Sequence, residues 1–267
     1  MKRCALALVA LIAAAPVARA ADDAPAAAEA PRKSISAVRT DHPPRIDGRL
    51  DDPAWAAAPP DDRFTQAFPA EGRPPTERAE VRVLYDDTAL YVGVRLHDSH
   101  PEQIVSRLTR RDRIPESDAV VVRIDSQHDH STSYGFRLHA SGVQADSLSY
   151  DDGNGSSPEW DAVWAGEASI DGEGWTAEYR IPLSVLRFAG GPDETWGLQV
   201  VRYVSRTGEQ DVWSFWPASQ RGEASHYDHL VGLRDLRPRR LFVLRPYLLG
   251  RLRGETPDGV TFLGLGR

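Results

Sequence analysis

Short apolar segments separated by turn residues fill the sequence from about residue 35 onward, and they constrain the fold more than any other feature. Most are rich in Val, Ile, Leu, Tyr or Trp, which is typical of β-strands. The strands are predicted within residues 80–87, 89–98, 118–125, 133–150 (two strands), 161–182 (two strands), 194–206 and 211–217. Only residues 51–58 and 183–188 are predicted to be helical, at one or two turns each. Short strands with almost no helix predict an all-β sandwich or barrel.

The first 20 residues have the pattern of a signal peptide. Lys2 and Arg3 precede an apolar, Ala-rich stretch, and Ala18-Arg19-Ala20 is a small-x-small cleavage site. We therefore expect export to the bacterial periplasm or outer membrane. The one cysteine, Cys4, lies in this peptide, so the mature chain holds no disulfide and no thiolate metal ligand.

The mature chain is acidic. Removal of residues 1–20 takes away three positive charges and changes the formal net charge from −7 to −10. This charge argues against a nucleic-acid partner. Residues 21–33 are rich in Ala, Pro and charged residues and are predicted to be a disordered tether.

The segment Pro43–Trp55, PPRIDGRLDDPAW, combines a turn with a helix start. Asp47-Gly48 favours a tight turn, and Pro53 favours the first position of a helix. Trp55 lies one turn inside, and we expect its large ring to be buried in the core.

Five segments together resemble the family 9 carbohydrate-binding modules, a jelly-roll β-sandwich related to the DOMON domains. They are RIDGRLDDPAW (45–55), AEVRVLYDDTALYVGVRLHD (79–98), ESDAVVVRID (116–125), GWTAEYRIPLSVL (174–186) and WGLQVVRY (196–203). The resemblance implies a DOMON-like sandwich over residues 34–237, in which the segment 43–55 forms the first strand and closes one end.

Three further segments, 107–112, 141–154 and 159–188, are similar to an uncharacterised bacterial family in which such a module precedes an outer-membrane β-barrel. Residues 241–254, LFVLRPYLLGRLRG, resemble the link into the first barrel strand. Residues 238–267 are therefore expected to be the short, strand-like start of a truncated barrel.

Sugar binding in such modules depends on aromatic rings that stack on the apolar face of a pyranose. The two clamp positions that the family resemblance implies hold Ile114-Pro115 and Ala224 here, and none of these residues is aromatic. The candidate sugar-binding residues are therefore Trp160, Trp216, Tyr227 and Tyr150. Alternatively, Trp160 covers a sheet edge. Trp175, Trp196 and Trp213 are expected in the core because they lie in alternating apolar strands.

Asp151, Asp152 and Asn154 lie beside glycines and could supply oxygen ligands to a structural calcium ion. The alternative is ordinary turn chemistry, in which Asp and Asn are common.

His128, His130 and His139 are a weaker candidate for metal binding, against a solvated turn. Haem ligation by methionine is excluded, because the mature chain has no Met.

No catalytic residue is assigned, since no nucleophile-elbow, zincin or P-loop pattern is present. Asp118 and Glu178 are expected to pair with the arginines of residues 107–113 or with Arg180. The sequence thus predicts an exported, non-catalytic carbohydrate- or glycan-binding module associated with polysaccharide breakdown by glycoside hydrolases. The alternatives are a periplasmic interaction or plug domain of an outer-membrane β-barrel without a sugar site, and a hydrolase with facing carboxylates.

Overall fold

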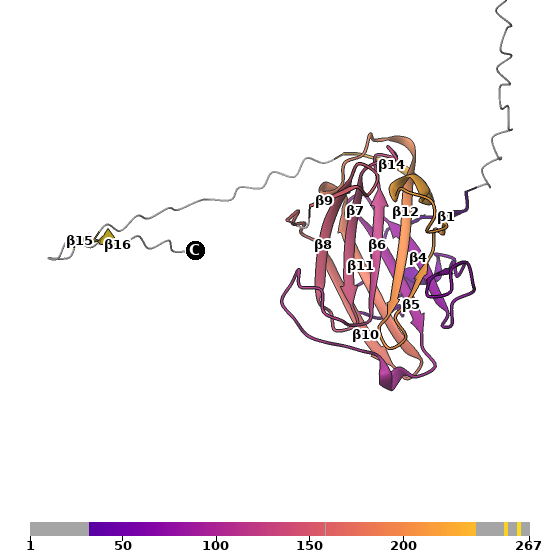
Figure 1. The fold of residues 1–267 in the computed structure, drawn as a ribbon. Coiled ribbons are helices and arrows are strands. Elements are labelled where there is room, and N and C mark those ends of the chain that lie inside the picture. The colour runs from indigo at the N-terminus through magenta and orange to yellow at the C-terminus, as the bar shows by residue number, and fades with distance from the viewer. Residues whose placement is uncertain (1–31, 158, 239–253, 256–260, 263–267) are drawn as a thin grey trace, which may run out of the picture. The chain divides into compact units, whose positions relative to one another are not determined.

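The structure is a computed structural model, which describes residues 32–157, 159–238, 254–255 and 261–262. Two β-sheets pack face to face, with β6, β7, β8 and β12 in one layer and β4, β5, β10 and β11 in the other (Figure 1). The predicted all-β sandwich is confirmed. Within the described residues, every helix is too short to span a bilayer.

The larger sheet has nine strands in the order β1-β14-β12-β6-β7-β8-β9, with β13 paired to β12 and β3 paired to β13. Its strands are β1 (Ser34–Ser36), β3 (Thr65–Phe68), β6 (Ala119–Asp125), β7 (Ser133–His139), β8 (Gln144–Tyr150), β9 (Gly155–Ser157), β12 (Gly191–Val204), β13 (Glu209–Val212) and β14 (Asp228–Leu236).

The smaller sheet has five strands in the order β10-β11-β5-β4-β2. Its strands are β2 (Val38–Arg39), β4 (Ala79–Tyr85), β5 (Ala89–His97), β10 (Ala165–Asp171) and β11 (Gly174–Pro182). The helical elements are α1 (Pro53–Ala56) and the 3-10 turns η1 (Pro101–Gln103), η2 (Leu183–Val185) and η3 (Ala224–His226). The short strands β15 (Gly254–Glu255) and β16 (Thr261–Phe262) pair with each other.

Most of the long strands follow the predicted segments. The expectation that the segment 43–55 forms the first strand is wrong, because β1 and β2 precede it and it contains turns and α1 but no strand. The hairpins β4–β5, β7–β8, β10–β11 and β12–β13 fall on the predicted strand segments of residues 80–98, 133–150, 161–182 and 194–217. The second helical segment is shorter than predicted, because it forms only the 3-10 turn η2.

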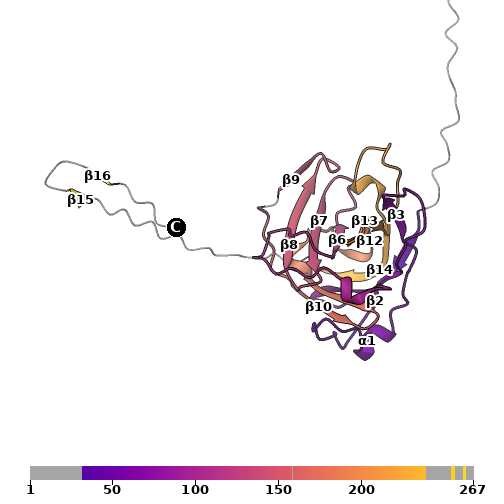
Figure 2. The same ribbon diagram turned by 60° about the horizontal axis from the view of Figure 1, so that its bottom comes forward.

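The main core lies between the two sheets. Trp175, Trp196 and Trp213 are fully buried there, as predicted. Trp55 is also buried, but in a separate cluster with Leu84 and Tyr91, on the outer side of the five-stranded sheet. In Figure 2, α1 covers this side of the molecule. Gly93 makes this contact possible, since a Cβ there would lie 3.0 Å from the Trp55 ring.

The N-terminal described segment joins the two sheets. β1 pairs in parallel with β14 of one sheet, and β2 pairs in parallel with β4 of the other. Arg32 donates hydrogen bonds of 2.6 Å to the carbonyls of Ser225 and Tyr227, and Lys33 bonds the carbonyl of Arg63. The predicted tether 21–33 is therefore wrong for its last two residues, which are tied to the sandwich by these bonds. Residues 1–31 and most of the predicted barrel start, 238–267, lie outside the described residues.

Candidate functional site

The outer face of the nine-stranded sheet is curved, with β9 and β3 on opposite rims in Figure 2. Strand register sets which side chains stand on this face. One row across the sheet runs Ala145–Arg137–Val121–Val201–Val212. The rows on either side carry Gly135–Arg123–Gln199 and His139–Ala119–Tyr203–Gln210.

Small residues keep the centre of this face low. Val121, Val201 and Val212 form a buried apolar cluster of their own, against which Tyr203 packs. Gly135 adds no side chain to this face, and a Cβ there would lie 2.7 Å from Oγ of Ser147. The longer side chains of Arg123, Arg137 and Tyr203 therefore stand above a low apolar floor.

A groove of about 330 Å³ lies over this floor. We use "the groove" for the hollow lined by Ala67, Glu71, Arg123, Gln199, Val201, Tyr203, Gln210, Val212, Trp216, Ala218, Gly222 and Glu223. The indole of Trp216 is half-buried and stacks on His226 at 5.1 Å between ring centroids. The groove thus combines aromatic rings, an apolar floor and polar side chains.

An ion pair forms one wall of the groove. Arg123 pairs with Glu223, and Glu223 also accepts a 2.8 Å hydrogen bond from the hydroxyl of Tyr227. Gln199 is buried; its Nε2 donates to the carbonyl of Ser214, and its Oε1 accepts from the backbone N–H groups of Val200 and Ser214. Gln199 therefore shapes the groove, while Gln210 and Glu71 have more exposed side chains for a ligand.

A second hollow of about 240 Å³ adjoins the groove and shares Tyr203 and Gln210 with it. We use "the side hollow" for the one lined by Pro115, Glu116, Ser117, Arg137, Tyr203, Val204, Ser205, Gly208, Glu209 and Gln210. The guanidinium carbon of Arg137 lies 4.4 Å from the centroid of the Tyr203 ring. Pro115, at one of the family's clamp positions, lies in this wall, whereas Ala224 at the other is buried.

Of the four predicted sugar-binding residues, the structure brings only Trp216 to the groove. The expectation that Tyr227 presents an accessible ring is wrong, because Tyr227 is 1% exposed and its hydroxyl is bonded to Glu223. Trp160 is half-buried against the inner-face rings of Tyr134 and Phe136. Tyr150 is 49% exposed and lies over Gly155 at the β8–β9 turn. Roles in sugar binding for Trp216, Trp160 and Tyr150 remain predictions.

Sequence reasoning missed Arg123, Arg137, Tyr203 and Glu223. The first three could have been found from strand alternation, since they occupy outer-face positions between buried inner-face residues. Glu223 lies in a loop, where no such period exists.

The predicted calcium residues are held by protein contacts. Asp152 accepts hydrogen bonds from the backbone N–H groups of Glu223 (2.8 Å) and Ser225 (2.9 Å) and from the Ser225 hydroxyl (2.6 Å). These bonds lower the pKa of Asp152 against the opposing effect of burial. The Asn154 amide donates to the carbonyl of Asp151. Turn chemistry accounts for these contacts, and calcium binding remains a prediction.

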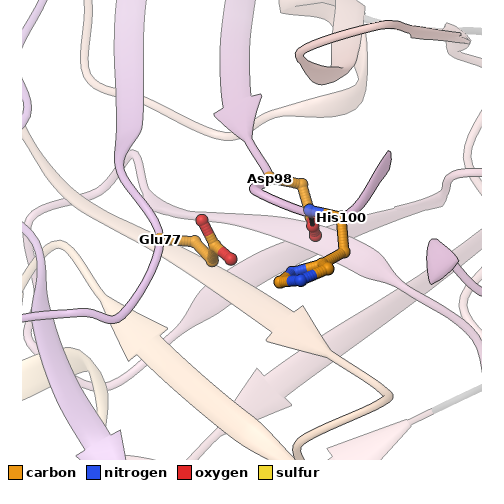
Figure 3. Close-up of side chains that lie close together, drawn as sticks. All are labelled: Glu77, Asp98 and His100. Carbon is orange, nitrogen blue, oxygen red and sulfur yellow. Dashed lines mark hydrogen bonds between the residues drawn. The ribbon is translucent and has the colours of Figure 1, made fainter. Parts of the chain in front are cut away.

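A different cluster, Glu77, Asp98 and His100, brings its potential ligand atoms within 4.8 Å of one another (Figure 3). Arg206 already bridges it, with a 2.7 Å contact to Glu77 and an ion pair to Asp98. A bound arginine neutralises the carboxylates that a cation would need, so this cluster is explained as an ion-pair network.

The prediction that His139 joins His128 and His130 in a metal site is wrong. His128 lies 4.5 Å from His130 and 5.2 Å from His229 between ring centroids, whereas His139 is fully buried at the end of β7. Burial lowers the pKa of His139 to about 4, and neither ring nitrogen has a hydrogen-bond partner among the described residues.

The expected arginine partners of Asp118 and Glu178 are also wrong. Asp118 accepts a 2.9 Å bond from the backbone of Ser205. Glu178 binds the N–H groups of the turn at Asp47–Arg49 and the indole of Trp55. Backbone donors replace the predicted arginines in both cases.

Two comparisons with known proteins agree on the fold. The nine- and five-stranded sandwich is similar to a family 9 carbohydrate-binding module from Caldicellulosiruptor kristjanssonii in complex with cellotriose, at 16% identity and a TM-score of 0.53, covering 80% of this chain and 100% of that one. The same module in complex with glucose gives 16% identity, a TM-score of 0.54 and coverage of 79% and 99%. None of the curated proteins compared with the sequence matches it significantly.

The sequence pattern of the family described as "Carbohydrate family 9 binding domain-like" matches residues 46–226, more than half of the chain. The matched region includes every residue that lines the groove, from Ala67 to Glu223. This chain belongs to the carbohydrate family 9 binding domain-like family.

Proposed function

We propose that this protein is an exported, non-catalytic module that binds a carbohydrate in the groove on the outer face of the nine-stranded sheet. The observation that carries the proposal is the composition of the groove. Trp216 and Tyr203 supply aromatic surface over an apolar floor, and Arg123, Glu223 and Gln210 supply polar groups at its walls. A pyranose needs this combination, with a ring for its C–H face and polar groups for its hydroxyls.

Two further facts support it. The chain belongs to a family of carbohydrate-binding domains, and the solved family 9 module to which it is similar was crystallised with cellotriose and with glucose. We propose further that the module acts beside glycoside hydrolases in polysaccharide breakdown, as its signal-peptide pattern and family resemblance suggest.

Isothermal titration of the mature chain with a panel of oligosaccharides, cellotriose among them, tests the proposal. We expect Trp216→Ala to weaken binding about tenfold or more, because an aromatic anchor in a pocket contributes strongly to affinity. Ile170→Ala is the control, since Ile170 is an exposed apolar residue on β10 of the other sheet and does not line the groove. It should leave affinity unchanged.

Flat titrations across the whole panel would contradict the proposal. They would favour the alternative prediction, an interaction or plug domain of an outer-membrane barrel without a sugar site. Equal losses from Trp216→Ala and Ile170→Ala would instead mean that the groove is not where the sugar binds.

A further inference from the structure

Arg137 stands on the groove side of the sheet without an acidic partner. It is half-buried on β7, its guanidinium lies over the Tyr203 ring, and it lines the side hollow. In the part of the chain that the structure describes, no carboxylate lies within 4 Å of Arg137 and no acceptor bonds its N–H groups. By contrast, Arg123 in the groove is paired with Glu223.

A run of arginines precedes the wall of the side hollow in the chain. The loop RLTRRDR, residues 107–113, carries four arginines in an otherwise acidic chain and leads directly into the wall formed by Pro115–Ser117. Arg111 is held by Asp146 at the edge of β8. Arg110 and Arg113 are exposed and, among the described residues, lie within 4 Å of no carboxylate.

The carboxylates of the side hollow, in contrast, have partners. Glu209 accepts bonds of 2.8 and 2.7 Å from the backbone and hydroxyl of Thr76. Glu116 is 3.8 Å from Arg107, with both side chains exposed. Among the charged side chains that line this hollow, Arg137 is therefore the one whose polar atoms have neither a hydrogen bond nor an ion pair among the described residues.

We infer that the ligand of this module is an acidic saccharide, whose uncharged rings lie in the groove beside Trp216 and whose anionic group is bound by Arg137 in the side hollow. The inference rests on the proposed function and names its substrate class. A guanidinium presents a fixed fork of N–H donors that matches a carboxylate or a sulfate, and a cation stacked on an aromatic ring is already oriented for that contact. The groove and the side hollow share Tyr203 and Gln210, so a single saccharide chain can occupy both.

The test uses charged and uncharged versions of the same sugars. The mature chain is titrated with trigalacturonate and its methyl ester, with triglucuronate and its methyl ester, and with a sulfated trisaccharide and its desulfated form. We expect at least one acidic member to bind about tenfold more tightly than its uncharged counterpart, and the preference to weaken as NaCl is raised. The pair that shows the preference distinguishes a carboxylate from a sulfate.

Arg137→Gln should reduce that preference to about twofold or less while the uncharged counterpart binds as before. Arg137→Lys keeps the charge without the fork and should keep part of the preference. Arg95→Gln is the matched control, because Arg95 is also a half-buried arginine, lies on the other sheet and is paired with Asp171, and should change neither affinity. Melting curves of all three variants verify that they are folded.

Equal affinity for acidic and uncharged members, or equal losses of both in Arg137→Gln, would overturn the inference and leave the proposed function standing. If no member and no neutral oligosaccharide binds, the proposed function and the inference both fail.

Discussion

The indole Nε1 of Trp55 donates a 2.8 Å hydrogen bond to Oε1 of Glu178, a residue 123 positions further along the chain. The other carboxylate oxygen of Glu178 accepts bonds from the backbone N–H groups of Asp47, Gly48 and Arg49, at 2.8–3.1 Å. One buried carboxylate on β11 thus holds both the turn and the helical turn of the segment 43–55. Burial raises the pKa of Glu178, although each of these bonds acts to lower it.

Glu178→Gln should destabilise the fold by ~2–4 kcal/mol. A carboxamide replaces one acceptor oxygen with an NH₂ group, which faces N–H donors and leaves them buried without partners. Urea unfolding of the variant and of Glu167→Gln measures the effect. Glu167 is the exposed residue opposite Glu178 on β10, and its replacement should change stability by less than ~0.5 kcal/mol. Equal effects of the two substitutions would contradict the prediction.

Asp211 should make stability fall as the pH rises. Its carboxyl is buried beside Glu209, and burial, together with the hydrogen bond and charge of Glu209, raises the pKa of Asp211 to about 8, against the opposing charge of Arg202. In the unfolded chain this carboxyl ionises near pH 4. The folded state therefore binds an extra proton between pH 4 and 8, and its contribution to stability is lost as the pH rises through this window.

Asp211→Asn removes the titration and keeps a donor toward Glu209. The unfolding free energy of the variant relative to the parent should rise by ~2 kcal/mol or more from pH 4.5 to pH 8.5. A difference that stays constant with pH would show that Asp211 is ionised in the folded protein.

His139 should make the free energy of unfolding fall as the pH is lowered, which is opposite to the effect of Asp211. Its folded pKa is about 4 because of burial and the nearby Arg137, whereas an unfolded histidine has a pKa near 6.5. The stability that the neutral ring contributes is complete above pH 6.5 and is lost as the pH falls toward 4. His139→Leu should therefore gain ~2 kcal/mol relative to the parent between pH 7 and pH 4.5. Chemical unfolding at both values gives the answer, and a constant difference would refute it.

Asp152→Ala should lower the melting temperature by the same amount in calcium and in EDTA. The Asp152 carboxylate is already bonded by the N–H and O–H groups of Glu223 and Ser225, so its loss removes protein contacts worth ~1–3 kcal/mol. Thermal melts of parent and variant in both buffers check this. A melting point of the parent that rises with calcium, and a variant that no longer responds, would establish the calcium site instead.

The sequence was a good guide to the strands and a poor one to the site. Strand pairs such as β4–β5 were predictable because apolar alternation and turn residues are local signals. The groove is not local. Its floor depends on Val121, Val201 and Val212 meeting in register across neighbouring strands, and no single segment shows that register. Tyr227 was misassigned for a similar reason, because its burial depends on Ser133 and Glu223, which lie elsewhere in the chain.

The parallel pairing of β1 with β14 also determines how the domain resists force. Ser34–Ser36 runs alongside His229–Val231, and bonds at both ends of the ladder, from His229 to Lys33 and from Ala37 to Val231, are 3.0 and 2.8 Å long. A pull applied at residue 32 and at residue 238 drives these two strands past each other. The hydrogen bonds between them are then loaded together in shear and do not open one after another, as they would in a peeled hairpin. A pull on the two ends of the described domain is therefore resisted by all the bonds of this ladder at once.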